Sequence, residues 1–167
     1  MSLDSMKHDP GLGYALRSVH NDETALVAQL IRLRDQHHDE HEIHHVTRDL
    51  LAWSHDNLAQ IVQVATRHQV QLSLSAGPAA GTLTPQPATV AAESSAVSLR
   101  LLEDLRTTYL LASAASLSWE LVAQHAKARR QSDVLELTGR CHPRTLRQLR
   151  WANTMLKTQS PQALTSL

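Results

Sequence analysis

The feature that most constrains the fold is a long stretch without helical periodicity, residues 69–92, near the middle of the chain. Proline, glycine, serine and threonine are frequent in it, which is typical of a connection. Connections of this length are uncommon inside a compact domain. One is expected where the chain must travel the length of a helical bundle between two helical pairs. The sequence therefore predicts two helical hairpins joined by one long crossover loop.

The segments on both sides of this loop carry apolar residues at spacings of three and four, as amphipathic helices do. Before the loop, helices are predicted from Asn21 or Asp22 to about His37 and over about 40–67. After it, they are predicted over about 91–128 and 132–158, with a turn near Arg130. The predicted fold class is all-α, an antiparallel four-helix bundle with one crossover between the second and third helices.

The ends of the chain are predicted to lie outside this bundle. Pro10, Gly11 and Gly13 interrupt any periodicity at the start, so residues 1–20 are interpreted as a flexible N-terminal arm. A single bundle domain then covers residues 21–158. Pro161 is expected to close the helical region, which leaves residues 159–167 as a C-terminal tail.

Composition narrows the class of protein. There is no phenylalanine, and only three tryptophans and two tyrosines, so the core must be built from aliphatic residues, which suits helices. Lysine plus arginine and aspartate plus glutamate both total 16, which makes nucleic acid an unlikely partner. No apolar run approaches the roughly 20 residues of a membrane span. A single cysteine, Cys141, fits a cytoplasmic protein without intramolecular disulfides.

A histidine-rich stretch, residues 37–45, suggests metal binding. His41 and His45 are one helical turn apart, a spacing that suits a transition metal on a surface. However, Asp39 and Glu42 have the spacing of a capping box, which indicates a helix start. The favoured interpretation is a histidine-rich corner between the first two helices, with metal binding by His41 and His45 as the alternative.

Residues Leu99 to Lys157 resemble the C-terminal hairpin of ferritin-like bundle proteins, and with the other helices and the crossover the resemblance covers about residues 20–158. Metal-binding members place a Glu on two helices and Glu-x-x-His on the other two. Here the one Glu-x-x-His, Glu42 with His45, points outward at a helix start. The corresponding slot of the last helix is predicted at residues 139–142. The resemblance implies the fold but not ferroxidase activity.

A candidate interior site lies on the third helix, where several polar residues share one flank of the apolar face. Glu120 is expected deep in an apolar context, opposite His142 of the last helix. Such a pair could do acid–base work or bind a small molecule, or it could be a polar network that fixes helix register. The predicted site comprises Ser54, Tyr109, Ser113, Ser116, Glu120 and His142.

A candidate interaction face lies on the last helix, where Arg140, Arg144, Arg147 and Trp151 form an outward stripe. It could bind an acidic partner or a nucleic-acid backbone. The favoured alternative is that it is solvated or pairs with the N-terminal half, since residues 1–90 hold 6 basic and 10 acidic residues. The third helix also carries a second apolar face, which includes Leu110, Leu117 and Leu121.

These observations predict a non-catalytic structural or interaction module, acting as a homo-oligomer or with a protein partner. No motif requires a cofactor. The alternative is a metal-binding or metal-dependent redox or storage protein, which would use iron, manganese or zinc with the histidines and a buried glutamate.

Overall fold

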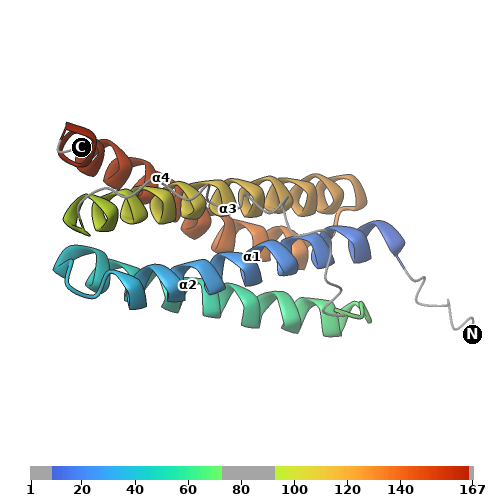
Figure 1. Cartoon of the computed structure of the whole chain (residues 1–167). Helices are drawn as coiled ribbons and strands as arrows, with labels where there is room; N and C mark the ends of the chain where they lie inside the picture. The colour runs from blue at the N-terminus through green and yellow to red at the C-terminus, as the bar shows by residue number, and fades with distance from the viewer. Residues whose placement is uncertain (1–8, 73–92, 166–167) are drawn as a thin grey trace, which may run out of the picture.

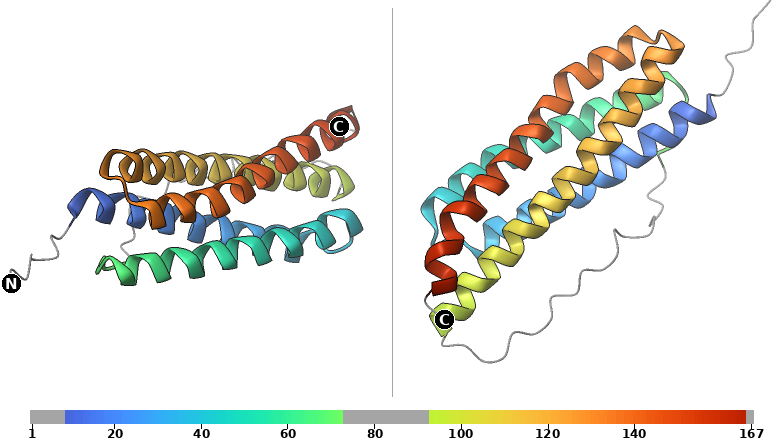
Figure 2. Two further views of the ribbon diagram at one scale, coloured as in Figure 1. Left: turned by 180° about the vertical axis from the view of Figure 1, so that it is seen from behind. Right: turned by 90° about the horizontal axis from the view of Figure 1, so that it is seen from above.

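The computed structural model describes residues 9–72 and 93–165, with side chains from residue 96 in the second range. These residues form four α-helices and no strand: α1 (Pro10–Gln36), α2 (His41–Arg67), α3 (Glu93–Arg129) and α4 (Ser132–Thr165). Figures 1 and 2 show the helices lying lengthwise beside one another. Helix α1 packs against α2 and α3, and α4 packs against α3 and α2. An all-helical fold of four packed helices is therefore confirmed. Most of the predicted crossover, residues 73–92, lies outside the described residues.

Helix α1 begins much earlier than the sequence predicts. Asp9 is its N-cap and accepts a hydrogen bond from the backbone N–H of Leu12 at 3.1 Å, while Pro10 occupies the first turn. Leu12, Leu16 and Val19 are buried and extend the apolar row of the helix towards its start. The prediction of a flexible arm is therefore wrong for residues 10–20, because packing of this row outweighs the two glycines. Residues 1–8 lie outside the described residues.

Two predicted helix boundaries also need correction. Helix α4 continues through Pro161 to Thr165, and the burial of Ala163 favours this last turn. The prediction of a tail is therefore wrong for residues 159–165. The capping box does not form either. Because α2 begins at His41, its N-cap is Glu40, which makes no side-chain capping bond, and Asp39 lies one residue too early.

Three histidine–aspartate pairs tie the helix ends together. Burial opposes ionisation of each aspartate, but hydrogen bonds, including one from histidine, hold the pKa of each below 3.8. Their stabilising contribution is therefore present above pH 3.8 and is lost as the pH falls through the folded-state pKa. The pairs are His125–Asp9 at 2.9 Å, joining α3 to the cap of α1, His37–Asp104 at 2.8 Å, joining the end of α1 to α3, and His68–Asp133 at 2.8 Å, joining α2 to α4.

The core consists of three apolar clusters spaced along the bundle. The first includes Leu16, Ile61 and Trp119, the second includes Leu26 and Leu50, and the third lies at the corner between α1 and α2. In α1, α2 and α4, fully buried polar side chains lie between the residues of the first and second clusters. This polar layer is the main interruption of the apolar interior.

Candidate functional site

Glu23 of α1 is a fully buried carboxylate inside the bundle, with 0% of the residue exposed. Its Oε1 atom accepts three hydrogen bonds, one from each of the other helices. Asn57 Nδ2 of α2 donates at 3.3 Å, Trp119 Nε1 of α3 at 2.8 Å and Thr145 Oγ1 of α4 at 2.6 Å. A single carboxyl group therefore links all four helices.

The same layer is extended between α2 and α4 by Gln148. Its Nε2 donates to Ser54 Oγ at 2.7 Å and to the backbone carbonyl of Leu50 at 2.9 Å. Two of the layer's buried oxygens, Glu23 Oε2 and Gln148 Oε1, have no hydrogen-bond partner among the described residues. We call this set the central polar layer, and all its members are fully buried: Glu23, Ser54, Asn57, Trp119, Thr145 and Gln148.

The placement of these residues follows from helix periodicity. Glu23 falls between Val19 and Leu26 on the buried row of α1, at spacings of four and three. Ser54 and Asn57 are three residues apart on α2, and Thr145 and Gln148 are three apart on α4. A spacing of three or four keeps two side chains on one face of a helix. Two helices thus contribute a pair of inward side chains to the layer, and α1 and α3 contribute one each.

Burial of the central polar layer and its hydrogen bonds act in opposite directions on the pKa of Glu23. Burial raises the pKa of Glu23 above its ordinary value of 4.5, and hydrogen bonds from Thr145, Trp119 and Asn57 oppose this without reversing it. The donors from Asn57, Trp119 and Thr145 all meet the Oε1 atom of Glu23. Burial also raises the pKa of the nearby Cys141 thiol to about 12, so that this cysteine is not a nucleophile at neutral pH.

The structure brings together part of the predicted interior site. Ser116 Oγ lies 2.9 Å from His142 Nε2, and His142 Nδ1 lies 3.8 Å from Glu120 Oε1. The predicted pairing of α3 and α4 at this level is therefore right. However, the Glu120 side chain is 55% exposed, so it is not the deeply buried carboxylate that was expected. Burial lowers the pKa of His142, and the charge of Glu120 opposes this.

The remaining predicted residues of that site are divided. Ser54 belongs to the central polar layer, away from the Glu120–His142 pair. Tyr109 and Ser113 are half-buried, and the Ser113 hydroxyl donates to the Tyr109 carbonyl of its own helix at 2.8 Å. The residues of the predicted interior site therefore belong to two separate groups of contacts. Of these, only the central polar layer, which includes Ser54, is fully buried.

The histidine-rich corner also divides into two parts. His41 and His45 are exposed, and their Nε2 atoms lie 3.1 Å apart. His37 is buried, because it continues the apolar row of α1, and it pairs with Asp104. Asp104 also receives hydrogen bonds from Arg32 at 2.8 Å and, through its backbone carbonyl, from Gln29 at 3.1 Å. Among the described residues, no group of three or more histidine, cysteine, aspartate or glutamate residues is placed to hold a metal ion.

The predicted interaction face of α4 turns largely towards the chain's own α2. Arg144 forms an ion pair with Asp56 and donates to Asn57 Oδ1 at 3.3 Å. Arg147 lies over the Trp53 ring, 5.9 Å from its centroid. Among the interpretations of this stripe, pairing with the acidic N-terminal half therefore describes Arg144. Arg140 is exposed beside Glu136 of its own helix, and half-buried Trp151 packs against the second and third apolar clusters.

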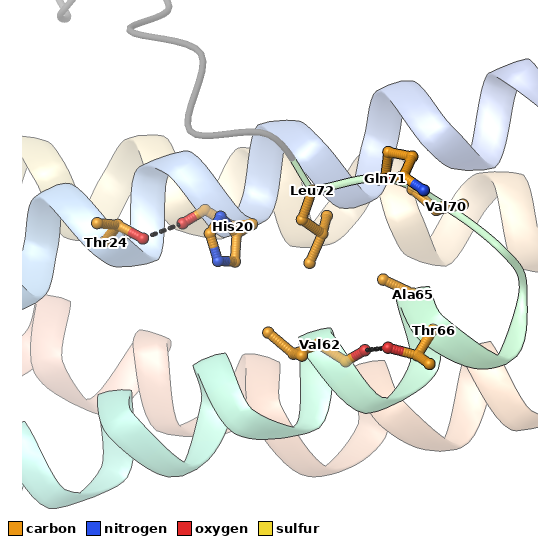
Figure 3. Close-up of a pocket in the computed structure, with 8 residues that line it drawn as sticks. All are labelled: His20, Thr24, Val62, Ala65, Thr66, Val70, Gln71 and Leu72. Atoms are coloured by element: carbon orange, nitrogen blue, oxygen red, sulfur yellow. Dashed lines mark hydrogen bonds between the residues drawn. The ribbon is translucent and has the colours of Figure 1, made fainter.

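A groove of about 610 Å³ lies between α1, α2 and the extended residues after α2. Figure 3 shows His20, Val62 and Leu72 pointing into it from these three segments. The ring atom His20 Nδ1 is buried and has no hydrogen-bond partner among the described residues. The groove is separate from the central polar layer, and no residue of the predicted sites lines it.

Comparison of the chain with protein families, with curated proteins and with solved structures finds no match. Within the described part of the chain, every helix falls short of the length and apolar character that a membrane crossing needs.

Proposed function

We propose that this chain is a ferritin-like, antiparallel four-helix bundle whose central positions hold a hydrogen-bond network instead of a metal centre, and that it serves as a non-catalytic interaction module. The observation that carries the proposal is the central polar layer. Ferritin-like metal proteins use one inward residue from each of two helices and an inward pair three residues apart from each of the other two. Glu23 and Trp119 occupy positions of the first kind. The pairs Ser54/Asn57 and Thr145/Gln148 occupy positions of the second kind.

The direction of the helices supports the same layout. The histidine–aspartate pairs bring the start of α1 to the end of α3 and the end of α1 to the start of α3. A further pair brings the end of α2 to the start of α4. Neighbouring helices in such an arrangement run in opposite directions. A crossover between α2 and α3 must then return along the bundle, as in ferritin-like proteins.

The chemistry of the layer argues against a metal in the interior. A di-iron centre needs several inward carboxylates and imidazoles, whereas Glu23 is the single ionisable ligand in this layer. The Trp119, Thr145 and Asn57 donors point hydrogen atoms at the Glu23 Oε1 atom that a cation would need. The layer therefore serves to join four helices and to fix their register, and the interaction surface must lie on the outside.

A second candidate function, metal binding at the surface, is favoured by the geometry of His41 and His45. Zinc bonds of about 2.0–2.1 Å at a tetrahedral angle hold two imidazole nitrogens roughly 3.3 Å apart. The separation of 3.1 Å between the two Nε2 atoms is close to this. The charge of His41 is the largest cause that lowers the pKa of His45, which favours the neutral form that binds metals.

One titration tests both proposals. Untagged, chelator-treated protein is titrated with Zn²⁺, and anaerobically with Fe²⁺ and Mn²⁺, by calorimetry and metal analysis. We expect Glu23→Gln to leave every binding isotherm unchanged. His45→Ala should weaken surface zinc binding at least about tenfold, and the exposed neighbour change His38→Ala should not. If the chain takes up metal, and Glu23→Gln abolishes this uptake whereas His45→Ala leaves it intact, the proposed hydrogen-bond network in the interior would be contradicted.

A further inference from the structure

The outer face of α3 carries a row of apolar side chains that no helix of the described chain covers. Leu110 is 39% exposed, Leu117 is 69% exposed and Leu121 is 49% exposed. With half-buried Ala114, they follow one another at spacings of four, three and four. These spacings keep a row on one side of a helix and are those of a helix–helix seam. We call Leu110, Ala114, Leu117 and Leu121 the α3 row.

The spacing of the α3 row is symmetric about a point midway between residues 115 and 116. If a second α3 packs in the opposite direction about that point, Leu110 lies opposite Leu121 of the second copy. Ala114 then lies opposite Leu117 of the second copy, so that large side chains meet small ones. A two-fold interface must be self-complementary in this way, because one surface serves both copies.

The charges at the two ends of the row are complementary under the same symmetry. Glu103 is exposed two helical turns before Leu110 on the same face. The operation places it opposite Ala128 of the second copy, whose neighbour Lys127 is exposed and basic. The other neighbour, Arg129, lies 4.0 Å from Asp9 of its own chain. Each end of the seam therefore brings the acidic Glu103 near the basic Lys127.

From this pattern we propose that the chain forms a two-fold homodimer through the α3 row, with the two α3 helices antiparallel. The proposal rests on the proposed function of an interaction module and names its partner as a second copy of the chain. The face from residue 103 to 128 is roughly 37 Å long at 1.5 Å per residue. At about 11 Å wide it covers roughly 400 Å² per copy, which is small for a specific interface. A weak, concentration-dependent dimer is therefore expected.

Sedimentation velocity of the full chain, from about 5 to 500 µM, tests the proposal. We expect a reversible monomer–dimer equilibrium. Leu117→Glu should raise its dissociation constant at least about thirtyfold, because a charge is placed at the centre of the seam. The helix content, followed by circular dichroism, should not change. The matched control Leu164→Glu, on an exposed leucine of α4, should leave the dissociation constant unchanged.

A charge exchange tests the orientation of the two helices. Glu103→Lys should weaken the dimer roughly threefold to tenfold at low salt, and adding Lys127→Glu in the same chain should restore most of the affinity. A chain that stays monomeric throughout, or a dimer that withstands Leu117→Glu, overturns the dimer. Failure of the charge exchange to rescue overturns the antiparallel register. Neither of these sedimentation results affects the outcome of the metal titration. A failure of the proposed interior network would therefore be distinguished from a failure of the dimer.

Discussion

Replacing Glu23 by alanine is expected to lower the free energy of unfolding by at least about 3 kcal/mol. The change leaves the Trp119, Thr145 and Asn57 donors without their acceptor. Each buried unsatisfied donor costs about 1–3 kcal/mol, and the cavity adds to this. Glu23→Gln keeps an oxygen for these donors and should remain within about 1 kcal/mol of the natural chain near pH 4.5. Urea unfolding followed by tryptophan fluorescence measures both.

The dependence of stability on pH distinguishes the natural chain, in which Glu23 can ionise, from Glu23→Gln, in which the amide cannot. Because the folded-state pKa of Glu23 is raised, its contribution is present below pH 4.5 and is lost as the pH rises through that pKa. The natural chain should therefore lose stability relative to Glu23→Gln as the pH rises from 4.5. Equal stability of the alanine and glutamine variants at every pH would show that the layer does not hold the helices together.

Replacing Asp104 by alanine is expected to lower the free energy of unfolding by about 3 kcal/mol at neutral pH. The change removes the carboxylate shared by buried His37 and half-exposed Arg32. Breaking a buried ion pair costs about 3–5 kcal/mol, and the exposure of Arg32 places this site at the lower end. The matched change Asp35→Ala removes an exposed partner of Arg34 and should leave the unfolding midpoint nearly unchanged.

Acid should remove the difference between the natural chain and Asp104→Ala. The pKa of Asp104 is held below 3.8, so its contribution is lost as the pH falls through that lowered value. Unfolding midpoints measured between about pH 6 and 2 should converge at the acid end. A constant difference over this range would contradict the role assigned to the pair.

Much of the fold follows from local sequence, because apolar spacing fixes which face of a helix is buried. The extent of α2 and the turn between α3 and α4 near Arg130 agree with the prediction, although the capping box expected at the start of α2 does not form. The start of α1 was not, because Pro10, Gly11 and Gly13 suggest a loop when taken alone. Their helical state depends on packing of Leu12 and Leu16 against other helices, which local propensity does not contain.

The candidate site was predictable only in part, for a similar reason. Assigning Asn21 or Asp22 as the helix start placed Glu23 in a first turn, where an acidic residue is ordinary. Extending the apolar row back to Leu12 would have placed it on the buried face. The position of Glu120 was misjudged, because it lies on the flank of α3 between α4 and solvent. The partners of Glu23 lie on three other helices, and only tertiary packing brings them together.

The central claim is that Glu23 belongs to a hydrogen-bond network that joins the four helices and does not bind a metal. The most direct measurement is the titration of its carboxyl carbon by NMR, with Glu23→Gln to assign the signal, in the absence and presence of Zn²⁺ or Mn²⁺. The account predicts a midpoint above 4.5 that neither metal changes. A midpoint below 4.5, or a midpoint that falls when metal is added, would contradict it.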